Sequence, residues 1–234
     1  MEINKYISSF IPDNEEYIYG FANLKAVLHP KYKDYYYGVV IGKKLDDNIM
    51  DSVISGPNFD YLELYKNTNV LLSELIHKIG NGLNNRGIPS CIVEPTLTEE
   101  ELKGNFEHTL KTDFSHKMAA TRAGLGWIGK TALFISEKFG PRLRLATILT
   151  NYHLDCSNSP VNESKCGVCK LCVIKCPAQA AKDVLWNINL YRDSFFDPFK
   201  CWAKCLELSF QKMKTHASIC GICVSVCPVG REKK

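Results

Sequence analysis

The pattern of apolar and polar positions in the first two thirds of the chain predicts a mixture of strands and helices. Residues 35–45 combine aromatic and β-branched side chains and stop at charged residues, which is typical of a buried strand. A helix is predicted from about residue 68 to a glycine at position 80 or 87. Its apolar positions follow the spacing of an amphipathic helix: Val70, Leu71, Leu75, Ile76 and Ile79.

Further elements follow with shorter signals. Residues 88–96 read as a second strand, and residues 99–123 are mostly polar or small and are predicted to be helical in part. Residues 132–135 and, beyond the turn signal at Gly140-Pro141, residues 142–150 are predicted strands. We therefore expect an α/β fold, more specifically of the α+β kind, and we find no low-complexity tract.

The composition of the chain, above all the distribution of its cysteines, indicates two domains. With 234 residues, of which 45% are apolar and 23% charged, the protein can bury one large core or a main core with a small appendage. Cys91 stands alone, whereas the other ten of the eleven cysteines lie between Cys156 and Cys227. We therefore predict one domain over residues 1–155 and a second over residues 156–234.

The compartment follows from what the sequence does not contain. No apolar run approaches the roughly 18 residues that span a bilayer, and the first residues lack the pattern of a signal peptide. We expect a cytoplasmic protein with no membrane partner, whose cysteines serve metal ligation or redox chemistry rather than disulfides. The net charge of +4 by itself makes no case for nucleic-acid binding.

Two cysteine runs carry the strongest chemical signal. The first has the C-x2-C-x2-C-x3-C-P spacing with which bacterial ferredoxins bind [4Fe-4S] clusters, and it comprises Cys166, Cys169, Cys172 and Cys176. The second has the spacing C-x2-C-x3-C-P and comprises Cys220, Cys223 and Cys227. Because the second run is one cysteine short, its missing ligand must come from elsewhere.

The crossed ligation of two-cluster ferredoxins then predicts two ligand sets. One consists of Cys166, Cys169, Cys172 and Cys227, and the other of Cys176, Cys201, Cys220 and Cys223. Cys205 is the reserve for Cys201, since one helical turn separates them if residues 200–208 are helical. A zinc module is the alternative use of such cysteine pairs. Cys91, expected as a buried core thiol, and Cys156 are not predicted ligands.

The stretch GLGWIGKT, residues 124–131, matches both a phosphate-binding P-loop and a dinucleotide fingerprint. Both motifs need a buried strand before the glycines and a helix after them, and neither is predicted here. The simplest alternative is that the glycines only form a tight turn. A third interpretation is a loop whose backbone approaches a flat cofactor, with Arg122 and Lys130 beside it. For these two residues, and for Arg142 and Arg144, a solvated strand edge is the expected position.

The order of these motifs, RAGLGWIGK, LATILTN and the two cysteine runs, resembles that of the epoxyqueuosine reductase family and, more distantly, of the corrinoid reductive dehalogenases. The resemblance covers residues 114–229. It implies a nitroreductase-like cobalamin-binding domain, followed by a ferredoxin-like module whose two [4Fe-4S] clusters deliver electrons to cobalt. The implied corrinoid contacts are Arg122, Gly124, Gly126, Trp127, Gly129 and Lys130. Cys201 matches the lone cysteine that precedes the family's second run.

Several details of the resemblance remain open. The family's proton-donating Asp lies in a V-D-x-x-P context, for which Asp113 stands at a shorter spacing and without the proline; His116 and the tyrosines at 35–37 can also donate. Asp113 has an alternative interpretation as a helix N-cap. No D-x-H-x-x-G motif supplies a histidine to cobalt.

The family's helical-repeat domain, which helps to bind tRNA, has no counterpart before Lys234. We therefore expect a small-molecule or nucleoside substrate rather than tRNA, and a low-potential electron donor such as ferredoxin or flavodoxin. The alternatives are an electron carrier without corrinoid, and a flavin-binding reductase.

Overall fold

The protein is described by a computed structural model that covers residues 2–97, 99–102 and 105–231. The chain forms two compact units that are interleaved along the sequence. The first unit joins Met1–Lys44, Thr68–Leu125 and Arg144–Val161, and the second joins Leu45–Asn67, Gly126–Leu143 and Asn162–Lys234. The predicted domain boundary near residue 155 lies close to Val161, the last residue of the first unit. Two earlier segments, Leu45–Asn67 and Gly126–Leu143, belong to the same unit as the C-terminal residues.

A four-stranded sheet in the order β1-β2-β6-β3 organises the first unit. Its strands are β1 (Tyr17–Asn23), β2 (Tyr37–Lys44), β6 (Leu143–Thr150) and β3 (Ser90–Val93). β1 pairs antiparallel with β2, and β3 pairs antiparallel with β6. The strands predicted near residues 35–45, 88–96 and 142–150 are confirmed. β1 was not predicted, because only Gly20 and Ala22 in it are buried and no apolar alternation marks it.

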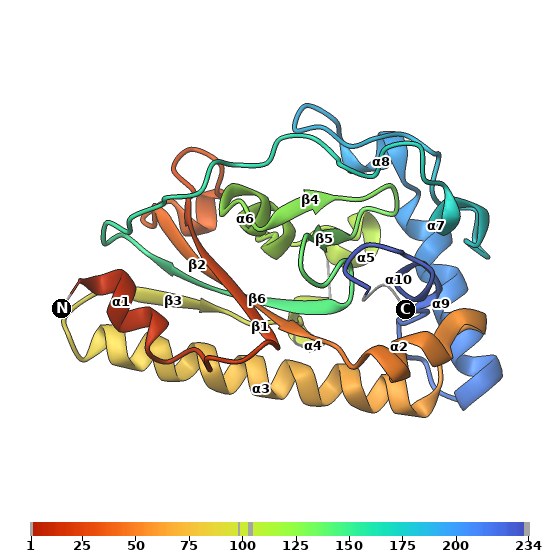
Figure 1. Ribbon diagram of the computed structural model, residues 1–234, viewed down its shortest axis with the longest axis horizontal. Helices are drawn as coiled ribbons and strands as arrows, with labels where there is room; N and C mark the ends of the chain where they lie inside the picture. Colours follow the sequence, from red (N-terminus) through yellow and green to blue (C-terminus); the bar gives the residue numbers. More distant parts are fainter. Residues whose placement is uncertain (1, 98, 103–104, 232–234) are drawn as a thin grey trace. The chain divides into compact units, whose positions relative to one another are not determined.

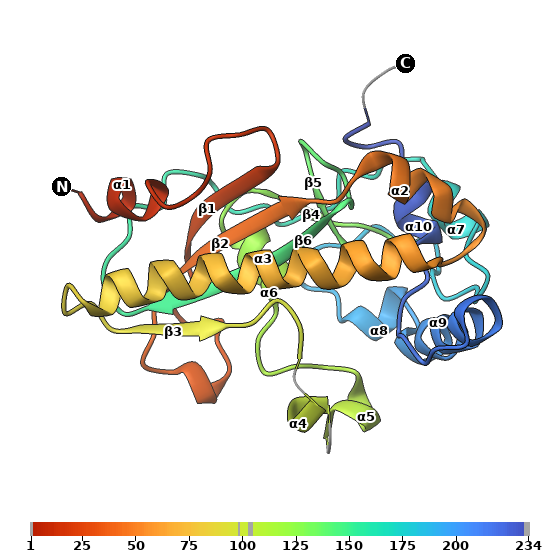
Figure 2. The same cartoon turned by 90° about the horizontal axis from the view of Figure 1, so that it is seen from below.

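Helix α3 (Phe59–Asn84) covers one face of this sheet with its residues from Thr68 onward (Figures 1 and 2). The contact buries side chains of both elements in one core, with Leu72, Ile76, Ile79 and Leu83 from the helix and Val39, Ile41, Ala146 and Ile148 from the strands. Because successive strand residues alternate between the two faces, Thr147 lies on the other side of the sheet.

Two features of α3 differ from the prediction. The helix begins at Phe59 rather than near residue 68, because the Asn58 side chain accepts a hydrogen bond from the amide of Tyr61 at 2.9 Å and caps the first turn. Val70 and Leu71, expected on the buried stripe, are exposed. With 3.6 residues per turn, the helix face that carries Ile76 and Ile79 also carries position 72, so Leu72 faces the sheet instead.

Helix α6 (His116–Arg122) lies on the opposite face of the sheet, against β1 and β2 (Figure 1). Gly20 in β1 suits this close approach, since a Cβ atom there would lie only 3.2 Å from that of Ala123, the residue after α6. Short elements complete the unit: α1 (Ile3–Ser8), η1 (Pro30–Tyr32), α4 (Glu99–Leu102) and α5 (Asn105–Thr109). The prediction that residues 99–123 are helical in part is therefore confirmed.

The second unit is built from short elements around the cysteine runs. These are α2 (Asp47–Ser52), η2 (Val53–Ser55), β4 (Gly126–Ile128), β5 (Phe134–Ser136), α7 (Leu171–Ile174), α8 (Arg192–Phe195), α9 (Pro198–Met213) and α10 (Ile222–Ser225). Its apolar core comprises Leu45, Met50, Val53, Tyr61, Met213, Ile219 and Val224. Helix α9 is capped by Asp197, which accepts from the amide of Lys200 at 3.0 Å, so Cys201 and Cys205 do lie one helical turn apart.

The GLGWIGKT stretch forms the first strand and part of the turn of a β-hairpin. Strands β4 and β5 pair antiparallel with Trp127 opposite Ile135, and no helix follows the glycines. The P-loop and dinucleotide interpretations therefore fail for the reason expected from the sequence. Gly126 is required by a close approach within the hairpin, because a Cβ atom there would lie 2.0 Å from the carbonyl oxygen of Ile135.

Among the described residues, no helix has both the length and the apolar character needed to cross a membrane.

Candidate functional site

Four thiols of the second unit form a first group around α7. The α7 turn carries Cys172, and burial raises the pKa of this thiol to about 11. Three neighbouring thiols add to this shift, those of Cys166, Cys227 and Cys169. The same four cysteines are those that crossed ligation assigns to one cluster. Cys227 comes from the end of the second run, so tertiary structure brings it to the first.

A second group of thiols lies between α9 and α10. Cys201 and Cys205 are one turn apart on α9, and the Cys205 thiol hydrogen-bonds with the thiols of both Cys201 and Cys220. The hydrogen bond with Cys205 lowers the pKa of Cys220 to about 7. Burial raises the pKa of Cys223, and the negative charges of Cys220, Cys201 and, from the first group, Cys172 add to this shift.

Two cysteines, Cys176 and Cys205, are candidates for the fourth ligand of the second group. Cys176 was assigned to this set, and its Sγ accepts a hydrogen bond from the amide of Ala180 at 3.4 Å. Cys205, named in advance only as a reserve, lies directly between Cys201 and Cys220. No three His, Cys, Asp or Glu side chains in the described ranges come close enough together to hold one metal ion.

The β4–β5 hairpin contacts the first cysteine group. Trp127 is buried, and its Nε1 donates a hydrogen bond to Cys166 Sγ at 3.4 Å. Gly129 faces the same sulfur, since a Cβ atom there would lie 3.6 Å from Cys166 Sγ and 2.5 Å from Cδ1 of Ile135. Two of the residues predicted to contact a corrinoid therefore pack against a predicted cluster ligand.

Lys130 is also directed at the first cysteine run. Its side chain is 3% exposed, and its Nζ donates to the carbonyl oxygen of Cys169 at 3.0 Å and to Asp183 Oδ1 at 2.8 Å. Hydrogen bonds from Lys130 and Lys170 lower the pKa of Asp183. The solvated position expected for Lys130 is wrong, because a paired ammonium can be buried where an isolated one cannot.

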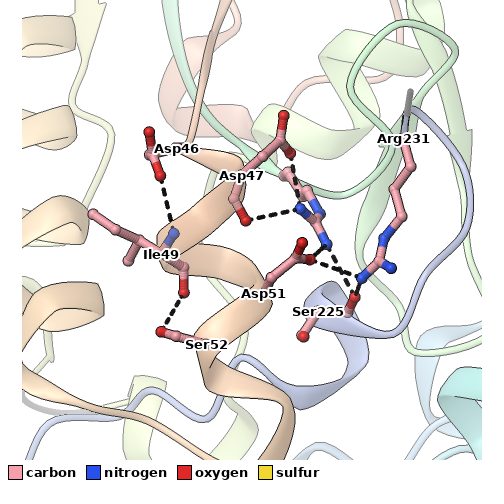
Figure 3. Close-up of polar contacts among 8 residues, drawn as sticks. Asp46, Asp47, Ile49, Asp51, Ser52, Ser225 and Arg231 are labelled. Carbon is pink, nitrogen blue, oxygen red and sulfur yellow. Dashed lines mark hydrogen bonds and ion pairs between the residues drawn. The ribbon is translucent and has the colours of Figure 1, made fainter. Parts of the chain in front are cut away.

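Arg142 is the centre of a buried polar network at the second cysteine run. Its side chain is 1% exposed, and it binds Asp47 at 2.8 Å, Asp51 at 2.5 Å and the carbonyl oxygen of Ser225 at 3.0 Å. Figure 3 shows Arg231 reaching Asp51 and the same Ser225 carbonyl. Ser225 belongs to α10, between Cys223 and Cys227, so this network ties the second run to α2.

The solvated strand edge expected for Arg142 is therefore also wrong. In the first unit, Arg144 likewise has protein partners, since it donates to Asn69 Oδ1 at 2.9 Å and to the carbonyl oxygen of Pro95 at 2.8 Å. Charge patterns along the chain could not reveal this, because the acidic and carbonyl partners come from distant segments.

The two predicted proton donors lie in the first unit. His116 bonds through Nδ1 to Thr147 Oγ1 at 2.8 Å and through Nε2 to the carbonyl oxygen of Glu94 at 2.9 Å. Because a carbonyl only accepts, Nε2 carries the proton and Nδ1 accepts from the Thr147 hydroxyl. Burial lowers the pKa of His116 to about 4, so the ring is neutral at pH 7.

Asp113 has a more open environment than His116. Its carboxylate is about half exposed and lies 3.6 Å from Lys31 Nζ and 3.9 Å from His29 Nε2. It does not cap α6, because Ser115 does so by accepting from the amide of Met118 at 3.2 Å. The alternative interpretation of Asp113 as an N-cap is thus wrong.

The remaining predicted corrinoid contacts, Arg122 and Gly124, lie where α6 ends. Arg122 is half-buried, which lowers the pKa of its guanidinium. Gly124 adopts a φ of +70°, and a Cβ atom there would lie 2.8 Å from the carbonyl oxygen of Ser159. Cys91 and Cys156 are half-buried thiols. The burial expected for Cys91 is not reached, because β3 is the edge strand of the sheet.

No protein-family model matches the chain. In sequence, the chain is 30% identical over 148 residues to an epoxyqueuosine reductase of Lactococcus garvieae, covering 56% of this chain and 37% of that protein. It is 43% identical over 67 residues to a tetrachloroethene reductive dehalogenase of Desulfitobacterium hafniense, covering 26% of this chain and 11% of that protein. The chain thus spans little more than a third of the reductase that it matches.

Solved structures show the same relationship at the level of the fold. The catabolic reductive dehalogenase NpRdhA matches with a TM-score of 0.68 at 15% identity, over 92% of this chain and 30% of its own. A reductive dehalogenase whose structure is described in terms of B12-dependent dehalogenation matches with a TM-score of 0.66 at 14% identity, over 92% of this chain and 30% of its own.

An epoxyqueuosine reductase bound to a modified tRNA-Tyr stem loop matches with a TM-score of 0.58 at 16% identity, over 97% of this chain and 64% of its own. By their names these proteins are reductases and reductive dehalogenases, which are oxidoreductases. The chain is therefore similar in sequence to epoxyqueuosine reductases, and it shares the α/β fold of these enzymes and of the reductive dehalogenases.

Proposed function

We propose that the protein is an iron–sulfur oxidoreductase that passes electrons through two [4Fe-4S] clusters to a bound cobalamin. The observation that supports this proposal best is the gathering of the cysteines into two adjoining groups, one around Cys172 and one around Cys220. Both groups are rich in thiols and contain no histidine, which suits iron–sulfur clusters. The ferredoxin-like character of residues 156–234 is part of this proposal.

Fewer residues are available to contact cobalamin than the six that the sequence suggests. Trp127, Gly129 and Lys130 already contact the cysteine run, so their role as corrinoid contacts remains a prediction. Arg122 and the backbone around Gly124 are the residues that we propose to hold the corrinoid, with the Arg122 cation near its polar groups. A bound corrinoid would supply a cobalt centre that acts as a strong reductant or nucleophile.

Asp113 is the better candidate for the proton donor of such a reduction. A donor must present a proton toward solvent or substrate, and the Asp113 carboxyl group is about half exposed. His116 holds its Nε2 proton against the carbonyl oxygen of Glu94 and is buried. The substrate that we propose remains a small molecule or nucleoside.

Electrons are proposed to enter at the first cysteine run. The two runs share the C-G-x-C sequence, yet Val168 is 94% exposed whereas the matching Ile222 is 7% exposed. Ile174, also in the first run, is 72% exposed. Residues 164–182 contain four exposed lysines, of which Lys165 pairs with Glu137 and Lys170 with Asp183, while Lys175 and Lys182 add positive charge to the surface. An acidic, low-potential carrier such as ferredoxin or flavodoxin suits this apolar and basic surface.

Electron paramagnetic resonance of the anaerobically reconstituted protein, before and after addition of cob(II)alamin, tests the proposal. We expect two reduced-cluster signals and a cobalt(II) signal that remains with the protein through gel filtration. Cluster signals with cobalamin eluting separately would instead support an electron carrier, or a flavin-binding reductase if flavin co-purifies. Zinc without iron–sulfur signals would exclude the proposal.

A further inference from the structure

The turn and first strand of the β4–β5 hairpin reach both cysteine groups of the second unit. Trp127 donates from its indole to Cys166 in the first group at 3.4 Å. Four residues later, the Thr131 hydroxyl hydrogen-bonds with the thiol of Cys223 in the second group. Both donors are buried, with 4% of Trp127 and 7% of Thr131 exposed. One short segment thus contacts a predicted ligand of each cluster.

The geometry points to a tuning function of this hairpin: Trp127 sets the reduction potential of one cluster, and Thr131 sets that of the other. The inference rests on the proposed presence of two clusters. It assigns the side chains of the GWIGKT segment to the clusters, whereas the sequence suggested a corrinoid or a simple turn. Trp127 and Thr131 act through the cysteine sulfurs and are therefore positioning residues.

The direction of the effect follows from charge. A cluster gains negative charge on reduction, and part of this charge resides on the cysteine sulfurs. A hydrogen bond donated to such a sulfur stabilises the reduced state more than the oxidised state, which raises the potential. Because both donors are buried, water does not replace them fully when they are removed, and the bond is stronger than it would be in solvent.

The charges near Trp127 are paired: Lys165 Nζ lies 5.7 Å from the centre of its ring and is paired with Glu137. Gly129 lies next to Cys166, and a side chain there would collide with Ile135 within the hairpin. Lys130 fixes the Cys169 carbonyl, and its charge is compensated by Asp183 at 2.8 Å. The neutral Trp127 N–H is therefore the group at Cys166 whose removal changes hydrogen bonding without changing net charge.

Redox titration of the reconstituted full chain, followed by electron paramagnetic resonance, tests the inference with two substitutions. We expect Trp127→Phe to lower the midpoint potential of one cluster and Thr131→Val to lower that of the other. The double variant should show both shifts. Trp186→Phe is the matched control, since Trp186 is half-buried in the same unit, and it should leave both potentials unchanged.

A measurement on the unsubstituted protein tests the inference even if a variant fails to assemble its clusters. Protein labelled with 15N at the indole nitrogens of its three tryptophans should show a hyperfine coupling to one reduced cluster, and both Trp186→Phe and Trp202→Phe should retain this coupling. Absence of the coupling, or two substitutions that shift the same potential or neither, would overturn the inference. Absence of cluster signals altogether would instead overturn the proposed function, and the inference with it.

Discussion

The guanidinium of Arg142 contacts Asp51 at 2.5 Å, and through the Ser225 carbonyl it also holds the helical turn between two cysteines of the second run. The arginine is buried, while the Asp51 side chain is 47% exposed. Arg142 can therefore satisfy three acceptors from two segments, whereas each acidic partner retains access to water. This asymmetry makes the arginine, rather than either aspartate, the critical member of the network.

Replacement of Arg142 by glutamine should destabilise the second unit. Glutamine cannot reach Asp47, Asp51 and Ser225 together, and loss of these bonds is expected to cost about 2 kcal/mol. For a chain of this size, that corresponds to a fall in the melting temperature of roughly 4–8 °C. Anaerobic thermal unfolding of the reconstituted protein, followed by circular dichroism, provides the measurement.

The matched comparison is Asp51→Asn, which keeps Arg142 in place and alters a half-exposed carboxylate. Its effect should be about 1 kcal/mol or less, because solvent screens the pair from one side. An equal loss in the two variants would contradict the central position of Arg142.

The cysteine ligands can be distinguished by iron content. Cys201→Ser should reduce the iron bound after reconstitution from about eight atoms per chain to about four, because it removes one ligand of the second cluster. Cys205→Ser should retain about eight iron atoms per chain if Cys205 only hydrogen-bonds with its neighbours. Cys176→Ser should behave like Cys201→Ser if crossed ligation holds.

Cys91→Ser serves as the control, since Cys91 lies in the first unit on β3. If Cys205→Ser lost half of the iron while Cys176→Ser kept it all, Cys205 would replace Cys176 as the fourth ligand.

The buried His116 should make the stability of the first unit depend on pH. Its pKa of about 4 in the folded protein lies below its ordinary value of 6.5, so the unfolded chain binds the proton more readily. Acidification from pH 6.5 toward pH 4 should therefore cost about 3 kcal/mol, whereas above pH 7 the contribution should be constant.

Melting temperatures of the wild-type protein and of His116→Gln, measured from pH 7.5 to pH 4.5, test this expectation. The glutamine variant should lose stability less steeply with acid. His108→Gln, at an exposed position, should follow the wild-type curve. Parallel curves for all three proteins would exclude His116 as the responsible group.

The proposed entry of electrons at the first run predicts an effect of surface charge on the rate of reduction. Ile174→Glu places a negative charge on this exposed surface and should repel an acidic carrier. We expect the second-order rate constant for reduction by reduced flavodoxin to fall about tenfold, which is equivalent to about 1.4 kcal/mol. Stopped-flow absorbance of the clusters follows the reaction.

Two controls distinguish weaker docking of the electron carrier from general damage to the variant protein. Ile54→Glu introduces the same charge at another exposed position of the second unit, in η2, and should leave the rate unchanged. Reduction by dithionite, which needs no protein docking, should be equally fast in all variants. A uniform decrease for both substitutions would argue against the first run as the docking surface.

Much of the fold could be predicted from local signals. β2 and β6 have dense apolar and β-branched patterns, and each lies close to its predicted range. β1 and the first turns of α3 escaped prediction, since β1 buries only small residues and the cap at Asn58 is a single polar side chain. Hydrophobic periodicity is strong only where one face of an element is uniformly buried.

The sequence by itself determined the chemistry available to this protein: two cysteine runs with the spacing of iron–sulfur ligands and a glycine segment whose context argues against a P-loop. Only the tertiary structure decided which groups meet. Trp127 and Cys166 are 39 positions apart, and Arg142 and Ser225 are 83 positions apart. Spacing along the chain constrains ligands that share a loop or helix. Partners from distant segments are brought together by packing of the whole unit, which no local pattern encodes.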